Sequence, residues 1–319
     1  MLITSIIFSL LIAAPLANFA YSQQPSQMGS KSSNNFDDDT NTNTNTNTPN
    51  IQDVPVEKVQ VGDIDIAYKM FGEGDPIILI NGLSAAMDSW DPTLLESLAS
   101  DHTVIVFSNR GIGNTTSGNG QNFSMALFEN DTAGLLDALN VTKADVLGYS
   151  MGGIVAQELA LNHPDKVGRL VLFATTCGGD ESLPPSQEVQ NALANQAATS
   201  EERFSQLVPL AIPEKWRNEN LENLPISSET VLNETVEKQT EAFFKWPGTC
   251  DRLKNITQPT LVIAGTQDVF APAVNSLIIT EHIPGAWLVQ FKEGGHGLIF
   301  QYPEQFSNIV KTFLENTNS

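Results

Sequence analysis

Short apolar runs recur along the chain, and segments with helical spacing of apolar residues separate them. The run "PIILI" is apolar throughout, which is typical of a strand buried on both faces of a sheet. The runs span residues 76–80, 103–108, 144–149, 168–176, 259–265 and 286–293. The segments with helical spacing include 88–100, 124–140 and 151–163, and a last helix starts at Pro303. This alternation of strand and helix predicts an α/β fold with a mostly parallel central sheet flanked by helices.

Two segments depart from the alternation. Residues 56–72 alternate between apolar and polar positions around Gly62 and Asp63, which predicts a β-hairpin before the parallel strands. Residues 178–250 carry no buried-strand run, and two amphipathic helical stretches fill 186–212 and 228–246. We therefore expect a helical cap over 178–250, inserted after the sixth strand of a core made of 55–177 and 251–319. Such an insertion lies at the carboxyl edge of the sheet, where parallel sheets bind ligands.

The first 54 residues do not fit the pattern of a packed fold. Residues 1–22 are mainly apolar, end in small residues and contain no Lys or Arg, which predicts a signal peptide cleaved near Ala20 or Ser22. An uncleaved membrane tether is the alternative, because about 20 apolar residues suffice to span a bilayer. Residues 23–54 are polar and of low complexity, which predicts a disordered linker. We expect an exported protein, either extracellular or at the cell surface.

Composition excludes some classes of partner. The 319 residues carry a formal net charge of −21, so a phosphate backbone would be repelled and nucleic acid is not an expected partner. The two cysteines, Cys177 and Cys250, form no metal-ligand spacing. They stand at the two ends of the predicted cap. A disulfide between them is one interpretation, and two small buried side chains are the other.

One serine occupies a position with chemical meaning. Ser150 lies in "GYSMGG", directly after the strand 144–149 and before a helix. A sharp turn between strand and helix strains the serine backbone and leaves no room for side chains two positions before and after it. Gly148 and Gly152 meet this requirement. The turn predicts an exposed Ser150 hydroxyl and directs the Met151 N–H, at the helix N-terminus, toward an oxyanion. The alternative is a glycine-rich packing turn without chemistry.

A serine nucleophile needs a base, and the base needs an orienting carboxylate. Of the four histidines, only His296 follows a strand on the carboxyl edge, in "KEGGHGLIF". Asp268 follows the strand 259–265 on the same edge and is the predicted partner of His296, with Asp180 in reserve. The Leu83 N–H, after the strand 76–80, is the predicted second oxyanion donor, and Ser84 is expected to line the same pocket. The glycine-rich residues 108–120 match no phosphate-binding spacing and indicate a structural loop.

The order of strand, Ser150, helix, Asp268 and His296 resembles the α/β-hydrolase superfamily, as do "HPDKVGRLVLFAT", "QPTLVIAGTQD" and "GGHGLIFQYPEQF". The resemblance covers about residues 57–315. It implies an α/β-hydrolase fold, no cofactor, and a Ser-His-Asp mechanism on esters, lactones or related acyl compounds. Asn81 stands where many members have His, and Asn109 stands where many have Asp. The second change is expected to remove a charge near the pocket rim.

The cap is expected to set the substrate. Its large apolar side chains are Phe204, Leu207, Leu210, Trp216, Phe243, Phe244 and Trp246. The cap contains no basic cluster, which favours a small, largely apolar ester or lactone over an anionic substrate. Three functions remain open at this point: an ester or lactone hydrolase, a carbon–carbon bond hydrolase or cofactor-free haloperoxidase-type enzyme on the same triad, and a ligand receptor with slow turnover.

Overall fold

The computed structural model describes residues 51–120, 122–195, 200–220, 227, 229 and 231–316. The predicted signal peptide and most of the predicted linker lie outside these residues. The predicted linker boundary at residue 54 is wrong, because Ile51–Asp53 form a 3₁₀ helix, and Ile51 and Val54 pack against the core. Within the described part of the chain, no helix has the length and apolar content needed to cross a membrane.

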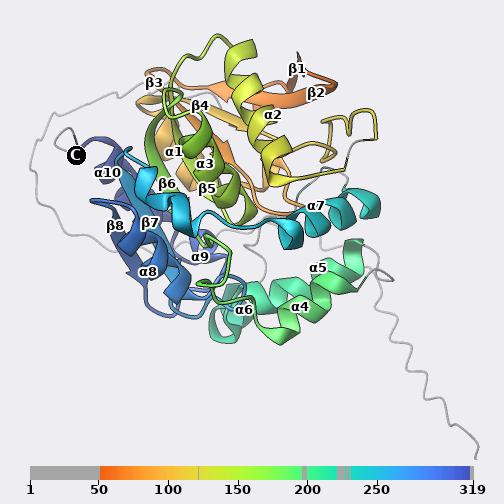
Figure 1. The fold of residues 1–319 in the computed structure, drawn as a ribbon, viewed down its shortest axis with the longest axis vertical. Helices are drawn as coiled ribbons and strands as arrows, with labels where there is room; N and C mark the ends of the chain where they lie inside the picture. Colours follow the sequence, from red (N-terminus) through yellow and green to blue (C-terminus); the bar gives the residue numbers. More distant parts are fainter. Residues whose placement is uncertain are drawn as a thin grey trace, which may run out of the picture. The chain divides into compact units, whose positions relative to one another are not determined.

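Eight strands form one sheet in the order β1-β2-β4-β3-β5-β6-β7-β8 (Figure 1). The predicted hairpin supplies β1 and β2, which pair antiparallel, and β2 pairs antiparallel with β4. All remaining pairs are parallel. The strands are β1 (Glu57–Val61), β2 (Ile64–Phe71), β3 (Asp75–Ile80), β4 (His102–Phe107), β5 (Ala144–Tyr149), β6 (Val167–Phe173), β7 (Thr260–Gly265) and β8 (Trp287–Phe291).

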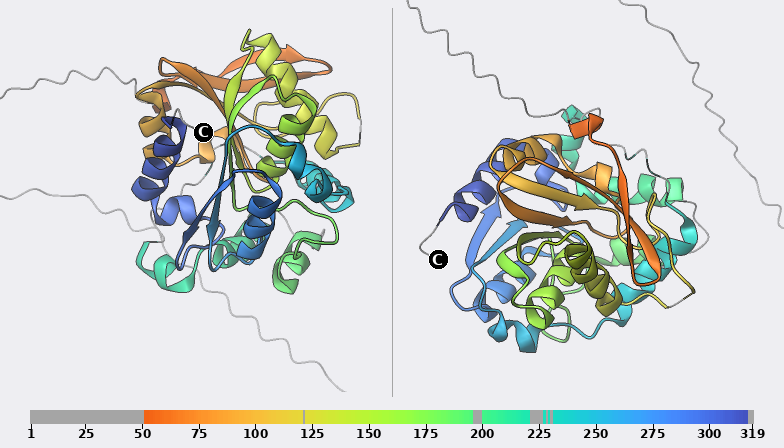
Figure 2. Two further views of the ribbon diagram at one scale, coloured as in Figure 1. Left: turned by 60° about the vertical axis from the view of Figure 1, so that its left-hand side comes forward. Right: turned by 90° about the horizontal axis from the view of Figure 1, so that it is seen from above.

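Helices cover both faces of the sheet (Figures 1 and 2). The core helices are α1 (Pro92–Ala99), α2 (Met125–Ala138), α3 (Met151–Asn162), α8 (Ala273–His282), α9 (Leu298–Gln301) and α10 (Pro303–Leu314). In β3, Ile78 and Ile80 face a cluster that includes α2, α3 and α8, whereas Ile77 and Leu79 face α1 and α10. This strand is buried on both faces, as its uninterrupted apolar run predicted.

Among the described residues, four α-helices between β6 and β7 form the cap, on one side of the sheet in Figure 1. The first predicted amphipathic stretch contains two helices, and a short third follows it. The cap helices are α4 (Gln187–Ala194), α5 (Ser200–Ala211), α6 (Glu214–Asn220) and α7 (Asn233–Lys245). At the cap ends, Cys177 and Cys250 form a disulfide with their Cα atoms 5.0 Å apart. The Thr249 N–H also donates to the Cys177 carbonyl at 2.7 Å, so the chain enters and leaves the cap at neighbouring points.

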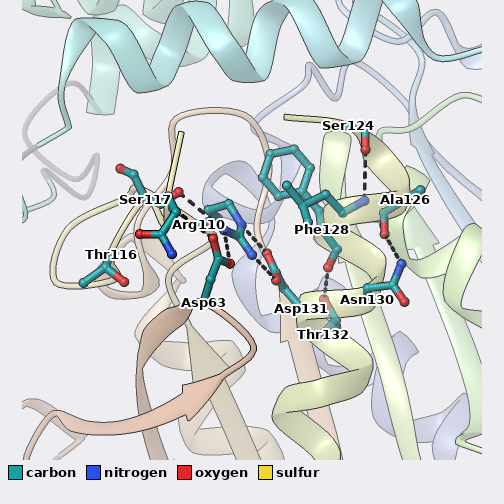
Figure 3. A network of polar contacts seen from close by, with 12 residues as sticks. Asp63, Arg110, Thr116, Ser117, Ser124, Ala126, Phe128, Asn130, Asp131 and Thr132 are labelled. Atoms are coloured by element: carbon teal, nitrogen blue, oxygen red, sulfur yellow. Dashed lines mark hydrogen bonds and ion pairs between the residues drawn. The ribbon is translucent and has the colours of Figure 1, made fainter. Parts of the chain in front are cut away.

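The glycine-rich residues 108–120 form a loop that a buried arginine fixes (Figure 3). The Arg110 guanidinium donates to both carboxylate oxygens of Asp131 at 2.8 and 2.6 Å and to Asp63 at 2.8 Å. Since Asp63 lies in the hairpin and Asp131 in α2, this one side chain ties the loop to two separate elements. The Asn119 N–H and Arg110 lower the pKa of Asp63, so its carboxylate stays charged.

Asn109 does not lie at the pocket rim, and that expectation is wrong. Its side chain is buried, and its amide donates to the Asn81 carbonyl at 3.1 Å, directly below the loop that carries Leu83. A neutral amide meets no ionic partner there and needs none. The residue therefore joins the ends of two strands.

Candidate active site

The turn around Ser150 is strained as its sequence predicts. Ser150 has φ 54° and ψ −118°, a backbone conformation that non-glycine residues rarely adopt. A Cβ on Gly148 would lie 2.5 Å from the Gly152 carbonyl oxygen, and a Cβ on Gly152 would lie 2.0 Å from the Ile80 carbonyl oxygen. Only glycine fits at both positions, so α3 packs directly against the end of β3.

Neighbouring strand ends hold Ser150 in this conformation. Its N–H donates to the Phe173 carbonyl at 3.0 Å, at the end of β6. The Thr175 hydroxyl donates to the Ser150 carbonyl at 2.7 Å. Thr175 was not singled out in the sequence, since a threonine after a strand carries no signal of this kind. The two bonds fix the serine backbone on both sides and direct its hydroxyl above the sheet.

Ser150, His296 and Asp268 form one chain of hydrogen bonds. His296 Nε2 lies 3.0 Å from Ser150 Oγ, and His296 Nδ1 lies 2.9 Å from Asp268 Oδ2. An ionised carboxylate only accepts hydrogen bonds, so Nδ1 carries the proton and Nε2 is free to accept from the serine. The arrangement matches a nucleophile, a general base and an orienting acid.

The carboxylate of Asp268 is fixed by its own loop. Its second oxygen, Oδ1, accepts hydrogen bonds from the N–H groups of Phe270 at 2.8 Å and Ala271 at 2.9 Å. Its side chain is fully buried. Because both oxygens are occupied, the carboxylate cannot rotate away from His296. The reserve candidate Asp180 lies in an exposed turn after β6 and makes no contact with His296.

Two aromatic rings hold the imidazole in place. Phe270 stacks on His296 with ring centroids 4.6 Å apart, and Tyr149 lies 5.2 Å away at a tilt. Burial raises the pKa of Tyr149 above its usual range, with a smaller contribution from Asp268, so this phenol stays neutral. The sequence did not point to Phe270, although it lies only two positions after Asp268. Both rings limit rotation of His296 between Ser150 and Asp268.

The backbone donors predicted for an oxyanion hole lie beside Ser150. Met151 is the first residue of α3, and Leu83 lies in the turn after β3. A Cβ on Gly82 would lie 3.2 Å from Ser150 Cβ, which shows how closely this turn passes the serine. Within the described residues, neither the Leu83 nor the Met151 N–H donates to a protein acceptor. Both donors therefore remain available to a ligand oxygen.

Asn81 holds the base of this turn. Its side-chain amide donates to the Ala86 carbonyl at 2.7 Å and to the Ser89 hydroxyl at 3.1 Å. Its own Oδ1 accepts from the Gly82 N–H at 3.3 Å. The side chain is buried and stabilises the loop, so the turn does not require a histidine at this position.

A cavity of about 620 Å³ opens onto Ser150 and His296, between the core and the cap. Its lining is mostly apolar, and Glu229 is its one carboxylate among the described residues. The cap contributes Leu193, Leu207, Val208, Ala211, Val231, Val236 and Phe243, and the core contributes Gly82, Leu83, Ser84, Ala85, Met151 and Phe270. Burial raises the pKa of the Glu229 carboxyl, which accepts a hydrogen bond from the Ser108 hydroxyl.

The predicted cap side chains divide between the cavity and other places. Leu207 and Phe243 line the cavity. Phe244 is 51% exposed, and the Trp246 indole donates to Glu158 in α3 at 2.8 Å, at the root of the cap. Leu210 and Trp216 are half-buried outside the cavity lining, and the Phe204 side chain lies outside the described residues.

The other three histidines lie away from the site. His102 begins β4 beside Asp101, and His163 follows α3 beside Glu129, both at the amino edge of the sheet. His282 ends α8 beside Glu181. No group of three or more potential metal ligands occurs in the part of the chain that the structure describes.

Comparison with known proteins agrees with this geometry. The family model for the alpha/beta hydrolase fold matches residues 75–303. Two bacterial relatives, each with "putative" in its name, are similar over most of their length. The carbamate hydrolase RutD of Azorhizobium caulinodans is 30% identical, over 79% of this chain and 96% of its own. The non-heme bromoperoxidase BpoC of Mycobacterium tuberculosis is 27% identical, over 80% of this chain and all of its own.

The chain is also similar to a solved structure. Est816, described as an enzyme that degrades N-acyl homoserine lactones, is 27% identical with a TM-score of 0.69. The match covers 81% of this chain and all of Est816.

Proposed function

The chain belongs to the alpha/beta hydrolase fold family, and we propose that it hydrolyses a small, largely apolar carboxylic ester or lactone through Ser150, His296 and Asp268. The family membership makes the chain a hydrolase. The observation that supports the finer assignment is the unbroken chain of hydrogen bonds from Ser150 Oγ through His296 to Asp268, at 3.0 and 2.9 Å.

The reaction follows from this geometry in two steps. Ser150 Oγ attacks the substrate carbonyl while His296 Nε2 takes its proton, and Asp268 stabilises the imidazolium that forms. The N–H groups of Leu83 and Met151 donate to the oxyanion, a donor of this kind contributing about 3 to 4 kcal/mol in other enzymes. His296 protonates the leaving oxygen. Water then attacks the acyl-enzyme, with His296 again as the base.

The lining of the cavity supports the substrate class. Its walls are mostly apolar, and its one described carboxylate, Glu229, opposes a negatively charged substrate group. The lactone-degrading Est816 and the carbamate hydrolase relative are both named for acyl compounds. A neutral ester or lactone is therefore the substrate class we propose for this chain.

Export is part of the proposal. The apolar residues 1–22 support a signal peptide or a membrane tether. The Cys177–Cys250 disulfide supports an oxidising compartment, since such bonds are rare where thiols are kept reduced.

A second candidate reaction has one observation in its favour. The relative from Mycobacterium tuberculosis is named as a bromoperoxidase, and it aligns over its whole length. The same triad would then serve a haloperoxidase-type reaction. Bromination of a phenol-red indicator, with acetate, hydrogen peroxide and bromide supplied, separates this activity from ester hydrolysis, because attack of hydrogen peroxide on an acyl-enzyme gives the peracid that oxidises bromide.

Hydrolysis of chromogenic esters tests the proposal. We expect p-nitrophenyl esters of short and medium acyl chains to be turned over repeatedly, and Ser150→Ala to abolish turnover while the thermal midpoint of unfolding stays close to that of the wild type. Turnover retained in Ser150→Ala would refute the assignment. A single burst without further turnover would instead favour a slow ligand receptor.

A further inference from the structure

One polar residue of the cap contacts the turn that carries Leu83. Gln239 lies in the middle of α7 and is fully buried. Its side-chain oxygen accepts a hydrogen bond from the Ser84 N–H at 2.8 Å, across a sequence separation of 155 residues. Val236 and Phe243, one turn before and after Gln239 on the same helix, line the cavity above Ser150.

The turn that Gln239 contacts is a strained β-turn. The Ala85 N–H donates to the Gly82 carbonyl at 3.3 Å, which makes residues 82–85 a β-turn with Leu83 and Ser84 at its centre. Ser84 has φ 57°, whereas Leu83 has no positive φ, and this combination defines a type II turn. Type II turns favour glycine at the third position, so serine there is strained.

A flip of the peptide between Leu83 and Ser84 would relieve this strain. The flip converts type II into type I, in which Ser84 takes a negative φ that suits any residue. It also reverses the Ser84 N–H and the Leu83 carbonyl beside the nucleophile. Gln239 stabilises the observed type II form, because its oxygen accepts the Ser84 N–H there.

Glutamine at position 239 is not the side chain that would stabilise the fold most. Its side-chain nitrogen is buried and has no hydrogen-bond partner among the described residues. A buried donor without an acceptor destabilises a fold, and an apolar side chain of similar size avoids that penalty. The bond to Ser84 is thus the contribution that distinguishes glutamine from methionine or leucine at this position.

We propose that Gln239 is a positioning residue of the active site, which fixes the turn 82–85 against α7 and thereby keeps the Leu83 N–H, at the start of this turn, in place beside Ser150 for the oxyanion. This inference rests on the proposed function, in which Leu83 is one of the two oxyanion donors. It also makes the active site complete only when α7 is docked on the core. The Thr235 hydroxyl, which donates to the Gly111 carbonyl at 3.1 Å, anchors the start of that helix.

Kinetics of Gln239→Met test the proposal. Methionine keeps the length of the side chain and removes the acceptor. We expect kcat for a p-nitrophenyl ester to fall about tenfold or more and KM to change less than about threefold, because the loss concerns the transition state. The thermal midpoint should stay close to that of the wild type, because the variant loses one hydrogen bond and also one unpaired buried donor. Thr240→Val, a buried change on the same helix outside the cavity lining, is the matched control and should retain wild-type kcat.

A second-site change separates positioning from general packing. Glycine accepts a positive φ without strain, so Ser84→Gly should hold the type II turn without help from Gln239. We expect the double variant Ser84→Gly/Gln239→Met to recover at least threefold in kcat over Gln239→Met. An aryl boronic acid, which forms a tetrahedral adduct with a serine, should bind Gln239→Met about tenfold more weakly than the wild type.

Three results would overturn the proposal: wild-type kcat in folded Gln239→Met, absence of any recovery in the double variant, or unchanged affinity for the boronic acid. Should Gln239→Met not be obtained folded, Gln239→Leu and its combination with Ser84→Gly carry the same comparison. Ser150→Ala distinguishes failure of the proposed function from failure of the inference about Gln239. If it is inactive while Gln239→Met is unaffected, the proposed function stands and this inference fails; if Ser150→Ala keeps wild-type turnover, the proposed function itself fails.

Discussion

Replacement of Asp268 by asparagine is a sharp test of the proposed mechanism, because the loop around this residue dictates how an amide would lie. Two backbone N–H groups, of Phe270 and Ala271, point at Oδ1 from 2.8 and 2.9 Å. The carbonyl oxygen of an asparagine would take this place, and its NH₂ group would then face His296 Nδ1. A donor at that position forces Nδ1 to accept, so the proton moves to Nε2, and His296 loses its ability to accept the proton of Ser150.

The cost of the opposite orientation sets the expected activity. Turning the amide around would place its NH₂ group against the two N–H donors and leave both without an acceptor. Each unpaired buried donor costs about 1–3 kcal/mol, so the competent orientation lies about 2–6 kcal/mol higher. At about 1.4 kcal/mol per factor of ten, only between roughly 1 in 30 and 1 in 20,000 molecules would keep a working base. We expect kcat to fall by about 10³-fold.

Steady-state hydrolysis of a p-nitrophenyl ester measures this loss, with circular dichroism to follow thermal unfolding. Asp268→Asn keeps both backbone hydrogen bonds, so its thermal midpoint should stay near the wild-type value. Asp180→Asn is the matched control, since Asp180 lies in an exposed turn and should be dispensable. A kcat of Asp268→Asn within tenfold of the wild type, in a folded protein, would refute the role of Asp268 in orienting His296.

Two further predictions concern stability and specificity. Replacing both Cys177 and Cys250 by serine should lower the free energy of unfolding in urea by about 4 kcal/mol, from the loop entropy of their 73-residue separation; equal mass after alkylation with and without reduction would contradict the bond. Burial raises the pKa of Glu229, so its charged form costs stability as pH rises through the folded-state pKa. Glu229→Gln should therefore be at least as stable as the wild type at pH 7, and this advantage should shrink as the pH falls below the folded-state pKa and be gone near about pH 4.3, the ordinary pKa of glutamate. It should also improve hydrolysis of a p-nitrophenyl hemisuccinate relative to a neutral ester several-fold, and an unchanged ratio would exclude a charge effect in the cavity.

Local patterns in the sequence were sufficient to predict the central sheet of this protein and the residues of its triad. Apolar runs predict strands because the central strands are buried on both faces, as Ile77 and Ile78 of β3 show. The sharp turn around Ser150 was also predictable, because the glycines that it requires, Gly148 and Gly152, lie within the same five residues. The order of Asp268 and His296 after their strands placed them on one edge of the sheet. The structure brings them into hydrogen-bonding distance there.

The side chains that support these residues could be identified from the folded structure but not from the sequence. Thr175, Phe270 and Gln239 contact the site from separate elements, and none of them stands in a pattern with a chemical meaning of its own. The expected rim position of Asn109 was wrong for the same reason, because its burial depends on how two strand ends meet. Periodicity reports the burial of an element against its neighbours, whereas a contact such as Gln239 to Ser84 depends on the packing of segments that are distant in the chain.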